Sequence, residues 1–342
     1  MAPAGRPRGF FRLPPMSKRL SLLAAALLAP LLAVSAACAA APWPAAKPIT
    51  LIVPVSAGGN VDTTARLVAQ RLGERLNQSI IIENVAGAGG VVGVGKAIHA
   101  QPDGYTAVMG FDGPISVAHL VNPAVRYDAE HRLAPVGLVT TAPVVMLARP
   151  GLAVNSMDEL LDLARREPGK LTYATSGVGT VLHLAVEVMQ EQAGVKLVHV
   201  PYRGGAQITN DVMGEQVDLG MLVTTSATPL VQQGKLRALG VTSAARASSL
   251  PQVPAFGETP ALKGFDLNTW TGLFVPAGTP PEIIARLNEA LNAVLKLPEV
   301  AARLKDGGAT PGEGSPAAFA DFLKKEQATY AHIVARAHIT QE

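Results

Sequence analysis

Three short turns, rich in glycine and hydroxyl groups, carry the residues of this chain that are best suited to chemistry. They span residues 54–62, 173–180 and 201–205, and each follows an apolar segment and precedes a helical pattern. Glycines leave backbone N–H groups exposed, and a helix that begins there adds a positive partial charge. Such turns can hold a carboxylate without arginine or lysine, so together they predict a site for a small acid. Each turn alone is more typical of an ordinary strand-to-helix connection, and only the three together favour a binding site.

The motifs of common enzymes are incomplete in this sequence. Gly90–Lys96 has the spacing of a phosphate-binding loop, but Ala97 replaces the hydroxyl residue that binds Mg²⁺, so we interpret it as a glycine-rich helix packed on a sheet. Ser176 and His183 are the best nucleophile–base pair, yet seven helical residues separate them by two turns, too far for direct proton transfer. The seven histidines lack metal-ligand spacing, and we interpret them as surface or packing residues. We therefore expect no catalysis, no metal and no cofactor.

Alternating strand and helix patterns position the three turns. Residues 49–53 form a short β-branched run typical of a buried strand, and apolar residues at 61, 65, 68, 72 and 76 predict the helix that follows. Asp62 is expected to cap that helix. Two α/β sets of about 100 residues, joined by extended segments at 134–149 and 270–276, indicate two lobes with a cleft between them. Further strands are expected at 79–83, 105–110, 171–175, 197–200, 218–223 and 237–242, and C-terminal helices at 280–297, 298–305 and 316–337.

The N-terminus has the pattern of a secretory signal peptide. The chain has 342 residues, and five of its 29 basic residues lie before Pro42, where there is no acidic residue. An apolar run at 20–34 and a small-residue segment at 35–41 follow them, so we predict a signal peptide over residues 1–40 that starts at Met1 or Met16. A transmembrane anchor is the alternative, but Pro30 interrupts the run. Cleavage would remove Cys38, the only cysteine, which excludes a disulfide scaffold or a thiol enzyme.

The residues of these turns, with others in the same order along nearly all of the mature chain, resemble the Bug-type substrate-binding receptors of tripartite tricarboxylate transporters. No single motif is specific, but their combination is. The matching segments are Trp43–Pro44, Lys47–Ile49, Val53–Asp62, Glu83–Asn84, Gly87–Gly90, Asn122–Pro123, Ala134–Val136, Tyr173–His183, Val200–Gly205, Gly214–Asp218, Gly234–Leu239, Leu250–Pro254, Trp270, Gly272–Leu273 and Pro276–Pro280.

The resemblance implies an α/β, type II periplasmic-binding-protein fold, in which two lobes joined by two crossover strands close on a ligand cleft. We place lobe 1 at 45–141 plus 272–342, lobe 2 at 142–271, and the hinge near Thr140–Thr141 and Thr271–Gly272. The resemblance further implies a monomeric receptor in the periplasm that passes a small-molecule carboxylate to membrane permease subunits. Beyond the N-terminus the chain has 24 basic and 26 acidic residues, and no basic patch indicates a nucleic acid as partner. Carried over by position, the ligand-binding residues are Val55, Ser56, Ala57, Gly58, Gly59, Asp62, Ser176, Gly177, Gly179, Thr180, His183, Tyr202 and Gly204.

Two departures from the family pattern bear on the ligand. Val55 stands where the family usually has an aromatic residue, and Leu222 stands where many members carry an acid. The missing acid makes an amino-acid ligand less favourable, so a mono- or dicarboxylate is favoured, and Asp112 near the hinge is a further candidate contact. Two alternatives remain open: an extracytoplasmic sensor subunit that reports to a signalling receptor, and an exported enzyme on the same fold.

Overall fold

The computed structural model describes residues 43–340. The predicted signal peptide over residues 1–40 therefore lies outside the described residues, and so does Cys38. Within residues 43–340, no helix is long and apolar enough to cross a membrane.

The first strand–helix series follows the sequence pattern closely. Strand β1 covers the predicted buried run, and apolar residues spaced three and four apart bury one face of helix α2. Strands β1, β2 and β3 pair in parallel, with β1 in the middle. This series contains β1 (Ile49–Val53), α2 (Asn60–Leu76), β2 (Ile80–Asn84), α3 (Val91–Ile98), β3 (Thr106–Phe111), a π-helical turn (Gly113–Val117), α4 (Ala118–Val121) and α5 (Ala129–Arg132).

The second series is also α/β. Strand β5 pairs in parallel with β6 on one side and with β7 on the other, so the carboxyl ends of these strands share one edge of their sheet. This series contains α6 (Met157–Arg166), β5 (Thr172–Thr175), α7 (Val181–Ala193), β6 (Val198–Pro201), α8 (Gly205–Met213), β7 (Leu219–Val223), α9 (Thr224–Gln232) and β8 (Arg237–Val241).

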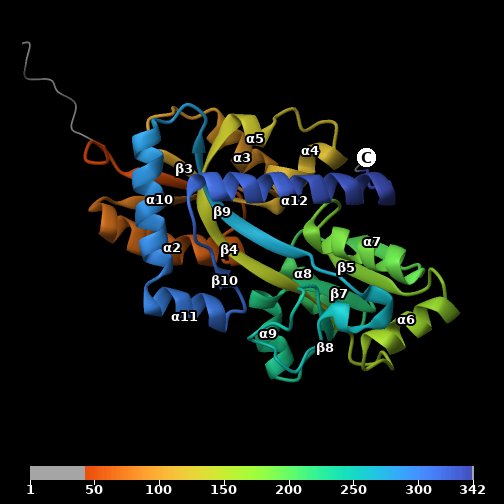
Figure 1. The fold of residues 1–342 in the computed structure, drawn as a ribbon. Helices are drawn as coiled ribbons and strands as arrows, with labels where there is room; N and C mark the ends of the chain where they lie inside the picture. Colours follow the sequence, from red (N-terminus) through yellow and green to blue (C-terminus); the bar gives the residue numbers. More distant parts are fainter. Residues whose placement is uncertain (1–42, 341–342) are drawn as a thin grey trace, which may run out of the picture. The chain divides into compact units, whose positions relative to one another are not determined.

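Two long strands connect the two series, as the extended segments predicted. Strand β4 (Leu133–Ala148) pairs with β9 (Asn268–Pro276) as far as Pro143, and from Val144 onward it pairs with β7 and β8. The strand order is β2-β1-β3-β9-β4-β7-β5-β6. Figure 1 shows β4 and β9 running side by side between the two series. The chain ends with α10 (Pro281–Leu295), α11 (Pro298–Asp306), β10 (Thr310–Pro311), which pairs with β4, and α12 (Pro316–Ala337).

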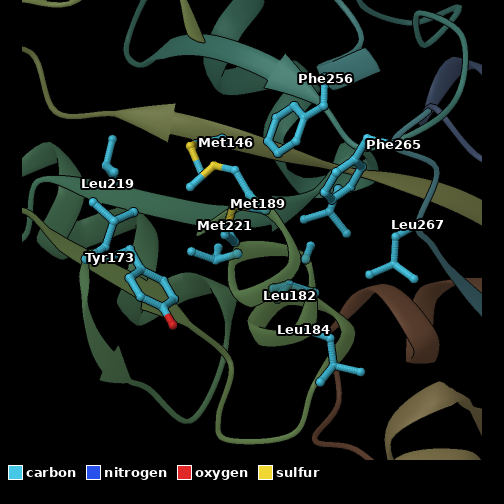
Figure 2. Packing of buried hydrophobic residues seen from close by; sticks show 14 of the residues in the cluster. Met146, Tyr173, Leu182, Leu184, Met189, Leu219, Met221, Phe256, Phe265 and Leu267 are labelled. Carbon is cyan, nitrogen blue, oxygen red and sulfur yellow. The ribbon is translucent and has the colours of Figure 1, made fainter. Parts of the chain in front are cut away.

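Separate hydrophobic clusters support the two series. One lies between α2, α10 and the first sheet, and another packs α6 and α7 against β4, β5 and β7 (Figure 2). Helix α12 contacts both series: its Phe319 packs with Phe274 of β9, whereas its Tyr330 and Ile333 belong to the cluster around α7. Helix α12, which we assigned to lobe 1, thus also packs against the second series.

Candidate functional site

The first predicted turn lies between the carboxyl end of β1 and helix α2. Ser56, Ala57, Gly58 and Gly59 are exposed there, while Val55 is partly buried against the core. Gly58 has a φ of +86°, and a Cβ added to it would meet no atom within 4 Å. Only glycine adopts this conformation without strain. The turn therefore presents its backbone to open space.

Helix α2 begins without a side-chain cap. Gly59 occupies the N-cap position and offers no side chain to the N–H groups of the first turn. We expected Asp62 to be the cap, but Asp62 lies inside the first helical turn and its Oδ2 accepts a hydrogen bond from Gly58 N at 2.8 Å. Its carboxylate therefore holds the turn in shape, and the N–H groups at the helix start are left available to an anion.

Asp62 is braced by two residues that the sequence analysis did not assign to the site. Arg66 Nε donates to Asp62 Oδ2 at 2.9 Å, and Asn84 Nδ2, at the end of β2, donates to Asp62 Oδ1 at 2.8 Å and to Val55 O at 3.1 Å. Burial by itself would raise the pKa of Asp62, but the bonds from Arg66, Gly58 and Asn84 outweigh it and lower that pKa to about 2. Asp62 is thus ionised and fully engaged by protein groups. The sequence feature that could have identified Asn84 as a residue of the site is its place at the end of a predicted strand parallel to β1.

The second turn, between β5 and α7, is more closely packed than the first. Thr180 is the N-cap of α7, and its side chain accepts from His183 N and donates to Gly177 O at 2.9 Å. Gly179 is buried, and a Cβ there would lie 2.6 Å from Val121 of α4. Ser176 and Gly177 remain partly exposed. Residues 173–175 and Gly179 are buried, so this turn reaches solvent only partly, at residues 176–178 and at Thr180.

His183 has its ring nitrogens directed at protein groups. Nδ1 accepts from Gly179 N at 3.2 Å, and Nε2 lies 3.5 Å from Glu187 Oε1. The same Glu187 oxygen accepts from the hydroxyl of Tyr173 at 2.6 Å. Burial favours the neutral acid, yet the bonds from His183 and Tyr173 lower the pKa of Glu187. Since His183 is 6% exposed, its geometry indicates that it supports the turn from behind.

The third turn joins β6 to α8, another helix without a side-chain cap. Gly204 is its N-cap, and a Cβ on Gly204 would meet nothing within 4 Å. The hydroxyl of Tyr202 donates to Asp211 at 2.7 Å. Both residues line a surface hollow of about 360 Å³ with Pro201, Arg203, Gln207 and Asn210. The phenol of Tyr202 is therefore held by α8, while the backbone at Gly204 remains open.

The structure brings the second and third turns together. Tyr202 N donates to Thr175 O at 2.8 Å, and a Cβ on Gly177 would lie 3.9 Å from Tyr202 O. Within residues 43–340, by contrast, no hydrogen bond joins residues 55–62 to either of these turns. The predicted hinge residues do meet: Thr140 Oγ1 and Thr271 Oγ1 lie 2.7 Å apart between β4 and β9.

Leu222 and Asp112, which the sequence analysis also singled out, are both buried. Leu222 is 1% exposed and packs in an apolar cluster behind α8. Asp112 accepts hydrogen bonds from Thr269 Oγ1 and from Trp270 N at the start of β9. Burial raises the pKa of Asp112 to about 6. Its observed partners are thus protein groups of the crossover strand.

The described residues offer no arrangement for metal chemistry. Among residues 43–340, no group of three or more histidine, cysteine or acidic residues could hold a metal ion. His183 uses its nitrogens on Gly179 and Glu187. What the three turns supply chemically is backbone N–H groups and hydroxyls, with uncapped helix starts at α2 and α8, all of which favour binding of an anion.

Comparisons with known proteins agree with this arrangement. The model of the tripartite tricarboxylate transporter family receptor (TctC) matches residues 64–339. Protein BugT of Bordetella pertussis is 31% identical over 290 residues, which cover 84% of this chain and 89% of BugT. The structure of R. palustris Rpa4515 with adipate is 32% identical with a TM-score of 0.82, covering 87% of this chain and 99% of that one. MatC (Rpa3494) from Rhodopseudomonas palustris with bound malate is 31% identical with a TM-score of 0.77, covering 84% and 99%.

This chain is therefore a solute-binding receptor by fold and by sequence. It belongs to the tripartite tricarboxylate transporter receptor family, which includes the Bug proteins. The predicted resemblance and the predicted α/β fold are both confirmed.

Proposed function

We propose that this protein is a periplasmic receptor that captures a small mono- or dicarboxylate between two lobes and delivers it to the permease subunits of a tripartite tricarboxylate-type transporter. The observation that carries the proposal is the turn at Ser56–Gly59, which ends in the uncapped start of α2. A carboxylate there accepts backbone hydrogen bonds next to the positive end of a 17-residue helix. Family membership and the adipate and malate complexes of similar proteins support the same class of ligand.

In this proposal the two lobes have different roles. Ser56–Gly59 receives the carboxylate first, and Ser176, Gly177 and Gly204 then close over it, with the hinge at Thr140 and Thr271. Each helix-terminus contact contributes only about 0.3–1 kcal/mol, so closure needs several of them at once. Asp62, Gly179, Thr180 and His183 keep the turns in shape, and Val55 forms one wall.

The test is calorimetric titration of the mature protein with adipate, malate and acetate, after a thermal-shift screen of a wider panel of acids. Gly58→Val should abolish binding, because its side chain would fill the open space above the turn. Gly169→Val is the matched control: Gly169 has a φ of +71°, equally open surroundings, and a place before the amino end of β5. Both variants carry a strain of about 1–2 kcal/mol, so their melting temperatures should fall together.

The outcome separates ligand binding from folding. Loss of binding in Gly58→Val alone supports the assignment. Equal affinity in the two variants, or a wild-type protein that binds no acid even after removal of any co-purified ligand, would contradict it. Transport of the identified acid into vesicles that contain the permease, with and without the receptor, then tests the transport partner.

A further inference from the structure

Thr175, the last residue of β5, connects the two turns of the second lobe. It is fully buried, and its Oγ1 donates to Gly177 O at 3.2 Å and accepts from Gly177 N at 3.3 Å. Its backbone oxygen accepts from Tyr202 N at 2.8 Å. One residue thereby holds Gly177 of the second turn and the start of the third.

The third partner of Thr175 Oγ1 is the imidazole of His199, whose Nε2 lies 2.7 Å away. His199 is on β6, the neighbouring parallel strand, where it pairs with Tyr173. Its ring contacts two others in near-parallel orientation: its centroid lies 4.1 Å from that of His183 and 4.9 Å from that of Tyr173, with interplanar angles of 13° and 22°. This stack determines where Nε2 lies, and hence where the hydroxyl of Thr175 is held.

The charged and titratable groups that face His199 belong to β5 and α7. Tyr173 comes from β5, and His183 and Glu187 come from α7. Burial lowers the pKa of His199 to about 4, while the charge of Glu187 opposes this shift. At neutral pH the ring of His199 is therefore uncharged. An uncharged imidazole stacks on its neighbour without repulsion and keeps one nitrogen for Thr175.

We propose that His199 is a positioning residue of the ligand site: packed against the rings of His183 and Tyr173, it holds Thr175 against Gly177 and so keeps the second-lobe turns in their ligand-binding shape. The inference rests on the proposed function in one respect, namely that these turns contact the ligand. His199 itself contacts protein groups, which is why no ligand-site motif pointed to it.

The test compares two variants of His199, of which one keeps a flat ring and the other keeps a nitrogen atom. His199→Phe keeps a flat ring for the stack but loses the nitrogen, whereas His199→Gln can place an amide nitrogen near Nε2. Loss of one buried hydrogen bond corresponds to roughly a threefold to tenfold weaker affinity for the bound carboxylate. We expect this loss of affinity in His199→Phe, and an affinity within about threefold of wild type in His199→Gln. Thr175→Val should lose as much affinity as His199→Phe, and the variant that combines these two changes should lose no more.

A second readout does not depend on any ligand. Amide hydrogen exchange at residues 176–178 should be faster in His199→Phe than in wild type, and restored in His199→Gln. In histidine NMR titrations, His199 should stay neutral from pH 8 to pH 5. Exposed His131, whose pKa is raised by its hydrogen bond to Asp128, serves as the internal control.

These outcomes separate the two proposals. If wild type binds none of the acids, the proposed function fails, while exchange and titration still decide the role of His199. Unchanged affinity and exchange in His199→Phe, equal losses in Phe and Gln variants, or titration of His199 near pH 7 would each overturn the positioning role.

Discussion

Replacing Asp62 by asparagine should destabilise the protein and weaken ligand binding together. Asp62 is 2% exposed, and its oxygens accept hydrogen bonds from Gly58, Arg66 and Asn84. A pKa lowered from 3.8 to about 2 corresponds to about 2 kcal/mol in favour of the folded, ionised form. Because solvent screens the interaction with the half-exposed Arg66, this value is an upper limit. An asparagine NH₂ would also face one of the donors, at a cost of about 1–3 kcal/mol.

Urea unfolding of wild type and Asp62→Asn at several pH values provides the assay. Because the pKa of Asp62 is depressed in the folded state, its stabilising contribution is complete well above pH 3.8 and is lost as the pH falls from 3.8 to about 2. The pH-dependent part of the difference between the two proteins should therefore be at most about 2 kcal/mol at pH 7 and should disappear in acid, which leaves the cost of about 1–3 kcal/mol from the misplaced NH₂ group. Arg66→Met is the control that leaves the carboxylate on Gly58 and Asn84, and it should lose less. Equal stabilities at pH 7, or a difference independent of pH, would refute the reasoning.

Three further predictions concern the scaffold. Gly93→Ala in α3 should lower the free energy of unfolding by about 1–3 kcal/mol, because the new Cβ would lie 2.6 Å from a backbone oxygen. Gly95→Ala should raise the free energy of unfolding by about 0.5–1 kcal/mol, because its Cβ would have nothing within 4 Å; equal shifts of the two variants in urea unfolding would contradict this. Thr140→Val should cost about 1–2 kcal/mol by leaving the buried Thr271 hydroxyl unpaired, and adding Thr271→Val should recover part of it in a double-mutant cycle. Burial raises the pKa of Asp112 to about 6, so wild type should lose stability as the pH rises from 4 to 6, whereas Asp112→Asn should not. Melting temperatures that change with pH in the same way in both proteins would contradict this prediction.

Most of the element pattern could be predicted from the sequence. The apolar spacing of α2, the β-branched run of β1 and the prolines at the starts of α10, α11 and α12 are local signals, and the structure confirms each of them. The interpretation of the phosphate-loop-like segment is also confirmed: Gly93 of α3 packs where a Cβ would overlap Val85 and Pro54.

The candidate site was only partly predictable. The glycine-rich turns correctly indicate exposed backbone: Gly58 adopts a φ of +86°, which other residues avoid. The roles of individual side chains within those turns did not follow. His183 and Tyr202 have the chemistry of ligand contacts, but Nε2 of His183 faces Glu187 and the hydroxyl of Tyr202 bonds to Asp211, four and nine residues further along the chain.

The sequence by itself determined where strands, helices and exposed turns occur, because the spacing of apolar residues and the conformational freedom of glycine act over a few neighbouring residues. Only the tertiary structure decided which groups support those turns. His199 meets Thr175 because they lie on neighbouring parallel strands, and Asn84 meets Asp62 because α2 begins beside the carboxyl end of β2, although these residues are 24 and 22 positions apart in the chain. Such contacts depend on strand order and register, and these are set by burial of the whole sheet rather than by any local pattern.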